Sequence, residues 1–195
     1  MATTIVLVRH GETDWNRERR FQGHADVPLN EEGRRQARVL AELLASESFA
    51  AAYSSPLRRA LETAEIIAER LGIGFEPSAG LKEVDVGSWS GLTTTEVEQR
   101  FPDGFGHWSV SRDGGWTDGE TYEELGTRVV SEVFELAERH PGERVLVVTH
   151  GGPIRSVLAI AAGLPFGSGR SKIGFVENCE MVQVAVREGA IEPVD

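Results

Sequence analysis

Histidine and arginine side chains follow three of the apolar segments in this chain. Arg9 and His10 close the first segment, an arginine pair at positions 58 and 59 follows the second, and His150 follows the third. A guanidinium fork matches the oxygens of a phosphate, and a neutral imidazole can attack phosphorus. These residue types therefore predict chemistry on a phosphoryl group, with His10 as the nucleophile.

The segments around these side chains have the pattern of an α/β protein. Short β-branched and apolar runs alternate with amphipathic helical patterns, as in sheets whose strands are joined by crossover helices. We expect strands over residues 4–9, 50–54, 144–149, 173–175 and 181–186. We expect helices over residues 31–46, 56–71, 94–100, 122–140 and 152–162. The predicted fold class is a three-layer α/β/α sandwich with a mostly parallel central sheet, crossover helices and an irregular lid segment.

Four residues mark the expected helix ends. Asn30 and Thr121 have the side chains that N-caps prefer, and Thr121 begins a capping box. Ser55, which precedes a proline, predicts another N-cap, and Gly72 predicts the end of the helix that follows. These signals fix where the elements that carry the charged side chains begin and end.

The sheet explains why distant residues would meet. Ligands of open α/β sheets bind beyond the carboxyl ends of the strands. Parallel strands would therefore place Arg9, His10, one arginine of the 58–59 pair and His150 at one rim. Packed cations repel one another unless an anion neutralises them, and the nearby arginines would lower the pKa of His10. A phosphate at this rim would neutralise the cations. The N-terminus of the helix after His150 would point its backbone N–H groups at that phosphate.

Residues 84–121 are less regular than the rest of the chain. We treat residues 1–195 as a single domain in which 84–121 form a lid or specificity insertion, with a purely structural excursion as the alternative. The stretch is rich in glycine and tryptophan and has one helical candidate, residues 94–100. The side chains expected to select a substrate are Trp89, Phe105, His107, Trp108, Arg112 and Trp116.

Composition limits the classes of partner. The chain has 195 residues, a formal net charge of -11 and one cysteine, Cys179. So acidic a chain is a poor candidate for binding nucleic acid or an anionic membrane. A lone thiol, and the lack of a signal-like or membrane-length apolar run, favour a cytoplasmic protein. We therefore expect a small phosphorylated metabolite as partner, no nucleic acid and no membrane, and we leave a homodimer open.

Other catalytic motifs are missing from the sequence. There is no phosphate-binding P-loop, and residues 87–91 carry Trp89 where a nucleophile elbow needs serine. His24, His107 and His140 are scattered, without the spacing of metal ligands. We interpret His140 as a charge at a helix C-terminus and the other two as surface or pocket-rim residues, and we expect no metal and no cofactor.

Seven blocks of sequence occur in an order that is typical of one family. The heptapeptide Leu-Val-Arg-His-Gly-Glu-Thr at residues 7–13 comes first. It is followed by Asp14–Asn16, Phe21–Gly23, Pro28–Leu29 with Gly33, Ser54–Ala60 with Thr63 and Ala64, Leu81–Glu83 with Gly87, and Thr149–Gly152 with Arg155. Over about residues 4–162 the chain thus resembles the histidine phosphatase superfamily, the phosphoglycerate mutase-like proteins.

The resemblance implies a role for each matched residue. His10 would be phosphorylated, and Glu83 would protonate the leaving alcohol and then activate water, with His150 beside them. Arg59 rather than Arg58 would bind phosphate, because the family's arginine stands directly before the alanine of this block. The phosphate-binding residues would be Arg9, Asn16, Gln22, Gly23, Arg59 and Gly151. Arginines and imidazole would stabilise the charge of the transferred group without a metal.

The stretch before the late helix separates the activities within this family. Mutase members carry a longer insertion with adjacent arginines, whereas residues 101–112 here hold a single arginine, Arg112. This favours a metal-independent phosphomonoester hydrolase that acts through a phosphohistidine on a small phosphorylated metabolite. The alternatives are a cofactor-dependent phosphoglycerate mutase and a noncatalytic phosphate-ligand sensor, and the substrate stays open.

Overall fold

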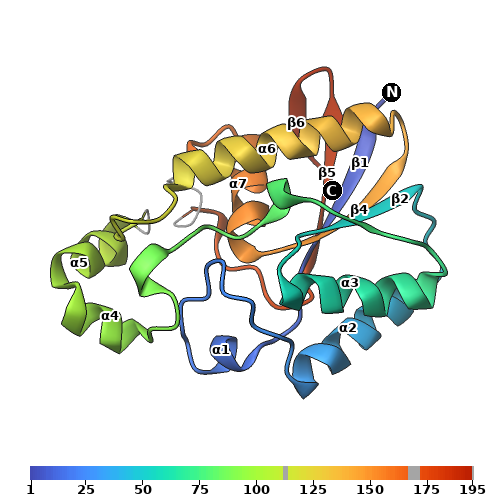
Figure 1. Cartoon of the computed structure of the whole chain (residues 1–195). Coiled ribbons are helices and arrows are strands. Elements are labelled where there is room, and N and C mark those ends of the chain that lie inside the picture. The colour runs from blue at the N-terminus through green and yellow to red at the C-terminus, as the bar shows by residue number, and fades with distance from the viewer. Residues whose placement is uncertain (112–113, 167–171, 195) are drawn as a thin grey trace.

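A six-stranded sheet lies at the centre of the part of the molecule that the structure describes (Figure 1). The structure is a computed structural model that describes residues 1–111, 114–166 and 172–194. The strand order is β3-β2-β4-β1-β5-β6, with β1 to β4 parallel and β5 and β6 antiparallel to their neighbours. The strands are β1 (Thr3–Arg9), β2 (Ala51–Ser54), β3 (Glu76–Pro77), β4 (Arg144–Thr149), β5 (Met181–Arg187) and β6 (Ala190–Pro193). The expected mostly parallel sheet is confirmed.

Helices cover both faces of this sheet, with α2 and α3 on one side and α6 and α7 on the other (Figure 1). The described helices are α1 (Asp14–Arg17), α2 (Glu31–Leu43), α3 (Arg58–Leu71), α4 (Thr94–Arg100), α5 (Pro102–Ser111), α6 (Tyr122–Arg139) and α7 (Gly151–Ala161). Two short 3₁₀ turns, η1 (Ala79–Leu81) and η2 (Gly87–Trp89), follow β3. The predicted three-layer α/β/α architecture is confirmed.

The central strand β1 shows why its sequence is continuously apolar. Successive side chains of a strand point to opposite faces of the sheet. Ile5 and Leu7 belong to the core that includes residues of α6 and α7, whereas Val6 and Val8 belong to the core that includes residues of α2 and α3. Because both faces of β1 are covered, Ile5 to Arg9 are all buried.

The beginning of α3 corrects one expectation about Ser55. The helix begins at Arg58 with Leu57 as its N-cap, so Ser55 does not cap it. The Ser55 hydroxyl oxygen instead accepts from the Leu57 backbone N–H and lies 2.7 Å from Nε2 of His150. The site and the tight turn use this oxygen, which leaves it unavailable for the helix N-terminus. The expected caps at Asn30, Thr121 and Gly72 are confirmed.

Short or glycine-containing elements differ most from the expectations. The strand expected over 173–175 is wrong, because these residues do not join the sheet, which instead gains β6. The sequence patterns also missed β3 and α1, which have two and four residues. They missed α5 because two glycines weaken its helical pattern, although Trp108 packs this helix against the core.

Tryptophans organise the stretch from residue 84 to 121. Trp89 is fully buried, and its ring centroid lies 6.2 Å from that of Trp108 and 5.4 Å from that of Trp116. Phe21, from the loop after α1, packs edge-on against Trp89 with centroids 5.1 Å apart. Edge-to-face aromatic pairs at these distances stabilise a packed cluster. The irregular stretch is therefore anchored to the core through its aromatic side chains.

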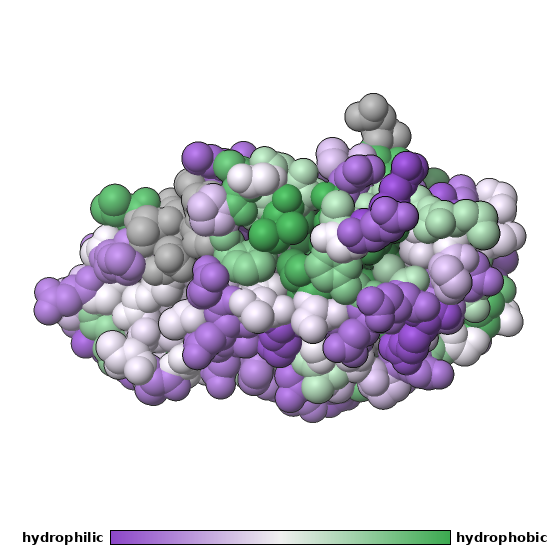
Figure 2. Space-filling model, turned by 90° about the horizontal axis from the view of Figure 1, so that it is seen from above, coloured by the Kyte–Doolittle hydropathy of each residue, from purple (hydrophilic) through white to green (hydrophobic). Residues whose placement is uncertain are grey.

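The surface over α6 is mixed in character. Figure 2 shows the molecule of Figure 1 as seen from above. On this face hydrophilic residues surround an area of hydrophobic ones. Phe134 of α6 and Leu158 and Ile160 of α7 are only partly buried. Within the described ranges, no helix has the length and apolar character that crossing a membrane requires.

Candidate active site

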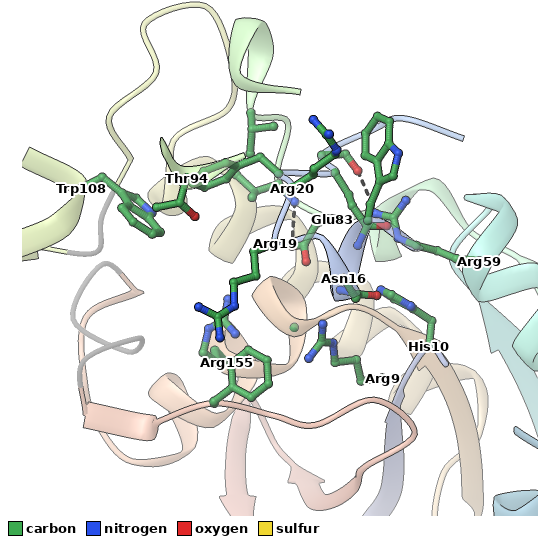
Figure 3. Close-up of a pocket in the computed structure, with 18 of the residues that line it drawn as sticks. Arg9, His10, Asn16, Arg19, Arg20, Arg59, Glu83, Thr94, Trp108 and Arg155 are labelled. Atoms are coloured by element: carbon green, nitrogen blue, oxygen red, sulfur yellow. Dashed lines mark hydrogen bonds between the residues drawn. The ribbon is translucent and has the colours of Figure 1, made fainter. Parts of the chain in front are cut away.

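A cavity of about 440 Å³ lies at the carboxyl ends of β1, β2 and β4 (Figure 3). Its described lining contains five guanidinium groups and a single carboxylate, that of Glu83. The cavity is therefore strongly cationic, although the whole chain carries a net charge of -11. The lining residues are Arg9, His10, Trp15, Asn16, Arg19, Arg20, Phe21, Gln22, Gly23, Arg59, Glu83, Val84, Val86, Thr94, Trp108, Trp116, Tyr122, Gly151, Arg155 and Phe175.

His10 lies directly after β1, with its ring held in one orientation. Its Nδ1 is 2.7 Å from the carbonyl oxygen of Gly11, and its backbone is tied to Thr149 and Asn178. A carbonyl oxygen only accepts, so Nδ1 carries the proton and Nε2 keeps its lone pair. Burial lowers the pKa of His10 well below its usual value, and the charges of Arg59 and Arg9 lower it further. The imidazole is thus neutral and nucleophilic at Nε2.

His150 follows β4 and packs edge-on against His10, with ring centroids 5.1 Å apart. It is fully buried and does not line the cavity itself. Burial lowers its pKa well below the usual value, with Arg59 as the next cause. Ser55 Oγ receives the Leu57 N–H and is placed to donate its own proton to Nε2 of His150. Nδ1 of His150, which has no hydrogen-bond partner among the described residues, would then carry a proton to donate.

Two arginines stand beside the histidines and are buried. Arg9 donates from Nη1 to the carbonyl oxygen of Val176 at 2.6 Å. Arg59 donates to the carbonyl oxygens of Ala25 and Gly23, at 2.9 and 2.8 Å. Burial lowers the pKa of each to about 10, although Glu83 raises it. Their Nε atoms lack partners in the described structure, so each guanidinium has spare donors for an anion.

The Arg58 and Arg59 pair is separated by the fold. Arg58 is exposed and binds Glu62 across one turn of α3, at 2.8 Å. Arg59, one position later, is buried and lines the cavity. Adjacent helix positions face about 100° apart, so only one of the two can point at the site. The structure therefore brings Arg59, and not Arg58, to the cavity.

Glu83 lines the cavity close to the end of β4. Its carboxylate accepts from the backbone N–H of Val84 at 2.9 Å and from that of Gly152 at 3.2 Å. A Cβ at Gly152 would overlap this carboxylate, so the glycine leaves room for Glu83 where α7 begins. The His24 ring contacts the Glu83 carbonyl oxygen at 2.8 Å. The sequence predicted only that His24 lies at the surface or the pocket rim. The structure adds that its ring contacts the backbone of Glu83.

The smaller predicted contacts also reach the cavity. Oδ1 of Asn16 accepts from the backbone and hydroxyl of Thr13, which leaves its amide nitrogen available as a donor. The Thr13 hydroxyl also contacts the side-chain oxygen of Gln22. Gly23 has a φ of +48°, where a side chain would strain the backbone. Gly151, at the first turn of α7, adds a backbone N–H to this rim.

The substrate-selecting side chains expected in 84–121 divide into two groups. Trp108 and Trp116 line the cavity. Trp89 lies in the core behind them, and Phe105 and His107 are not among the lining residues. Arg112 falls outside the described residues. Tryptophan spacing alone did not reveal which ring faces the cavity, because η2 and α5 orient them.

Several lining residues were not assigned a role from the sequence. Arg19 and Arg20 enter from the loop after α1, Arg155 from α7, and Phe175 from the segment before β5, where it stacks on Arg9 at 4.9 Å. Arg155 lies one helical turn beyond Gly151, a spacing that could have indicated it. The described residues contain no cluster of three or more His, Cys, Asp or Glu side chains able to hold a metal ion.

Residues 5–194 match the model of the histidine phosphatase superfamily (branch 1). The chain belongs to this superfamily. It is 42% identical over 160 residues to phosphoglycerate mutase-like protein 4 of Arabidopsis thaliana, covering 78% of this chain and 68% of that one. It is 41% identical over 165 residues to the metal-independent phosphoserine phosphatase of the same organism, covering 80% and 67%.

The fold of this histidine phosphatase superfamily member is also shared with solved structures. The mycobacterial glucosyl-3-phosphoglycerate phosphatase in complex with VO3 superposes with a TM-score of 0.85 at 30% identity. The match covers 97% of this chain and 95% of that one. Family membership, which the sequence blocks implied, is therefore established.

Proposed function

We propose that this protein is a metal-independent phosphomonoesterase that transfers the phosphoryl group of a small metabolite to His10 and then to water. The observation that carries the proposal is the state of His10. Its Nδ1 is engaged by Gly11, so a neutral ring keeps Nε2 for attack, beside the buried arginines Arg9 and Arg59. The named phosphatases among its relatives support the same reading.

The first step forms a phosphohistidine. Nε2 of His10 bonds to phosphorus while the bond from phosphorus to the leaving oxygen breaks. Arg9, Arg59 and the amide of Asn16 would bind the phosphoryl oxygens, with Gln22 and the backbone at Gly23 and Gly151 completing the site. His150, which packs against His10 outside the cavity lining, would assist through Nδ1, which has no hydrogen-bond partner among the described residues. Glu83, protonated at this stage, would give its proton to the leaving alkoxide.

The second step returns the enzyme to its starting state. Glu83, now a carboxylate, takes a proton from a water molecule. The water oxygen bonds to phosphorus, the bond to Nε2 breaks, and inorganic phosphate leaves. Each step thus uses Glu83 in the opposite protonation state.

Residues 84–121 would form the specificity part of this single domain. They supply Val84, Val86, Thr94, Trp108 and Trp116 to the cavity wall. These five side chains carry no charge and no phosphate-binding fork is among them, so they would contact the leaving alcohol rather than the phosphoryl group. The anchoring of the stretch through Trp89 supports a fixed wall in this role.

Replacing His10 tests the proposal directly. His10→Ala should abolish hydrolysis of p-nitrophenyl phosphate and remove an acid-labile phosphoenzyme detectable by mass spectrometry. His107→Ala, at an exposed position of α5 outside the cavity lining, is the matched control and should keep both. Activity of the wild-type enzyme should persist in EDTA. Full activity of His10→Ala would overturn the assignment.

A mutase remains the second candidate, because a relative that is 42% identical has a mutase-like name. Incubation with 3-phosphoglycerate and a bisphosphoglycerate primer separates the two activities. Release of inorganic phosphate supports the phosphatase, and formation of 2-phosphoglycerate supports the mutase. Tight phosphoester binding without turnover would instead support a noncatalytic sensor.

A further inference from the structure

The cavity holds positive charge beyond its two buried arginines. Arg9 and Arg59 are buried and stand beside His10, where the proposed function uses them for the transferred group. Arg19 is exposed and Arg155 is partly buried, so both lie nearer to the cavity mouth. Figure 3 shows their side chains in the same cavity, and the charge of Arg155 lowers the pKa of Arg9. The inner and outer cations therefore form one continuous positive field.

Arg20, the neighbour of Arg19, is a lining arginine whose side chain is paired within the protein. Its Nε lies 2.6 Å from Glu18, and its Nη1 lies 3.2 Å from Glu96 and 2.8 Å from the carbonyl oxygen of Gly91. Arg20 thereby joins the loop after α1 to the helix α4. Its charge is balanced within the protein, so it has little left for a ligand.

The side chain of Arg19 differs from that of Arg20 in its contacts. In the described part of the chain its side chain makes no hydrogen bond and no ion pair, and the carboxylate that lines the same cavity, Glu83, lies near the buried arginines. An arginine that projects into a cationic cavity is repelled by its neighbours unless an anion enters. The position therefore suits a ligand group that carries negative charge.

The backbone at Arg19 is also unusual. Its φ of +55° lies in the left-handed region, which side chains with a Cβ disfavour and glycine adopts freely. The turn is held by the N–H of Arg19 on Asn16 and the N–H of Arg20 on Trp15, at 3.1 and 2.8 Å. Backbone positions of this kind cluster at active sites and ligand-binding sites.

We infer that Arg19, with Arg155 in the same cavity, forms a second anion subsite that binds an oxyanion on the leaving alcohol of the substrate. The oxyanion is a carboxylate or a second phosphate, since a guanidinium fork accepts either. This inference rests on the proposed function and narrows the substrate class to phosphomonoesters with a second negative group. It also explains why the cationic field extends beyond the reacting phosphate.

A matched pair of substrates measures the subsite. 3-Phosphoglycerate and glycerol 3-phosphate differ only in a carboxylate that replaces a hydroxymethyl group. We expect kcat/KM to favour 3-phosphoglycerate by about tenfold, the value of one charge-assisted hydrogen bond. A second pair, propane-1,3-diol bisphosphate and its monophosphate, tells whether a phosphate is preferred to a carboxylate. No preference in either pair would overturn the inference.

Two variants locate the preference at Arg19. Arg19→Gln should remove most of it by raising KM for the anionic substrate, and Arg19→Gly should do the same while raising Tm, because glycine relieves the left-handed backbone. Arg17→Gln is the control, since Arg17 is exposed, pairs with Asp14 at 2.9 Å and does not line the cavity. Equal losses on both members of a pair, or a preference that survives in Arg19→Gln, would contradict the subsite.

Binding separates this inference from the proposed function. In the His10→Ala background, calorimetry should show that 3-phosphoglycerate binds about tenfold more tightly than glycerol 3-phosphate, and that Arg19→Gln removes the difference. This measurement needs no turnover. If the wild-type enzyme hydrolyses nothing but this difference persists, the phosphatase proposal fails and the subsite stands. If the wild-type enzyme hydrolyses phosphomonoesters but this difference in affinity is absent, the phosphatase proposal stands and the subsite fails.

Discussion

The two walls of the cavity are built in different ways. The inner wall consists of residues that follow the parallel strands, and its polar side chains are oriented by backbone groups, as His10 is by Gly11 and Arg59 by Gly23. The outer wall includes five residues from 84–121, a stretch whose tryptophans pack edge-on against one another. One wall is held by hydrogen bonds to the sheet and its loops, the other by aromatic packing.

The difference indicates a division of labour. Hydrogen bonds to fixed backbone groups set the position and tautomer of a side chain, which phosphoryl transfer requires. Aromatic packing sets the shape of a surface and tolerates changes in detail more readily. Changes to the inner wall should therefore affect catalysis with every substrate, whereas changes to the outer wall should affect stability and substrate choice.

The largest effect is expected at Arg59. Arg59→Lys keeps the charge and loses the fork that binds Gly23, Ala25 and the phosphoryl group. We expect kcat/KM to fall by about a thousandfold on aryl and alkyl esters alike, as when a transition-state donor is removed. Arg58→Lys, one residue away and exposed, should stay within about twofold, since exposed pairs contribute little. Similar losses in both variants would contradict the separation of the pair.

The outer wall is tested next by Trp89→Ala. Removing a fully buried tryptophan should lower the free energy of unfolding by about 3 kcal/mol or more, as measured by urea denaturation. Hydrolysis of p-nitrophenyl phosphate should persist in the folded fraction, because Trp89 does not touch the cavity. Val110→Ala, at an 85% exposed position of the same stretch, is the control and should change stability by less than about 0.5 kcal/mol. Loss of catalysis without loss of stability would contradict the claim that the outer wall determines stability and the inner wall determines catalysis.

Glu83 links the two walls and should show a smaller, substrate-dependent effect. Glu83→Gln should slow hydrolysis of alkyl phosphates by about a hundredfold and of p-nitrophenyl phosphate much less, because nitrophenolate leaves without a proton. Gly152→Ala should act in the same direction, since its Cβ would displace the Glu83 carboxylate. The readout is the ratio of kcat/KM for the two esters. An unchanged ratio in both variants would exclude the acid role of Glu83.

The smallest expected effect is the change in stability per pH unit. His10 and His150 are buried with pKa values well below the usual 6.5, so the folded state resists protonation that the unfolded state accepts. Stability is therefore complete above about pH 6.5 and falls as the pH drops below it, by up to about 1.4 kcal/mol per pH unit for each histidine. Urea denaturation of wild type and His10→Gln between pH 7 and 5 measures the slope. The slope should decrease in the variant, and an equal slope would contradict the burial of an uncharged His10.

Residues next to strand ends were predictable, and residues in irregular segments were not. The sequence placed Arg9, His10 and His150 at one rim because parallel strands have a fixed direction. In the structure Arg9 and His10 line the cavity, and His150 packs against His10 outside its lining. The role of Glu83 came from the family resemblance, because a loop carboxylate has no periodic signal. Arg19 and Arg155 drew no functional assignment, since most arginines of a protein lie at its surface without a specific role.

The sequence by itself determined the α/β class, the main strands and helices, and the set of groups able to handle a phosphoryl group. Those features depend on local periodicity and residue chemistry, which a linear pattern records. Only the tertiary structure decided that Ser55 serves His150 instead of capping α3, and that Trp108 faces the cavity while Trp89 lies behind it. Such choices depend on contacts between residues far apart in the chain, and those contacts exist only after the elements have packed.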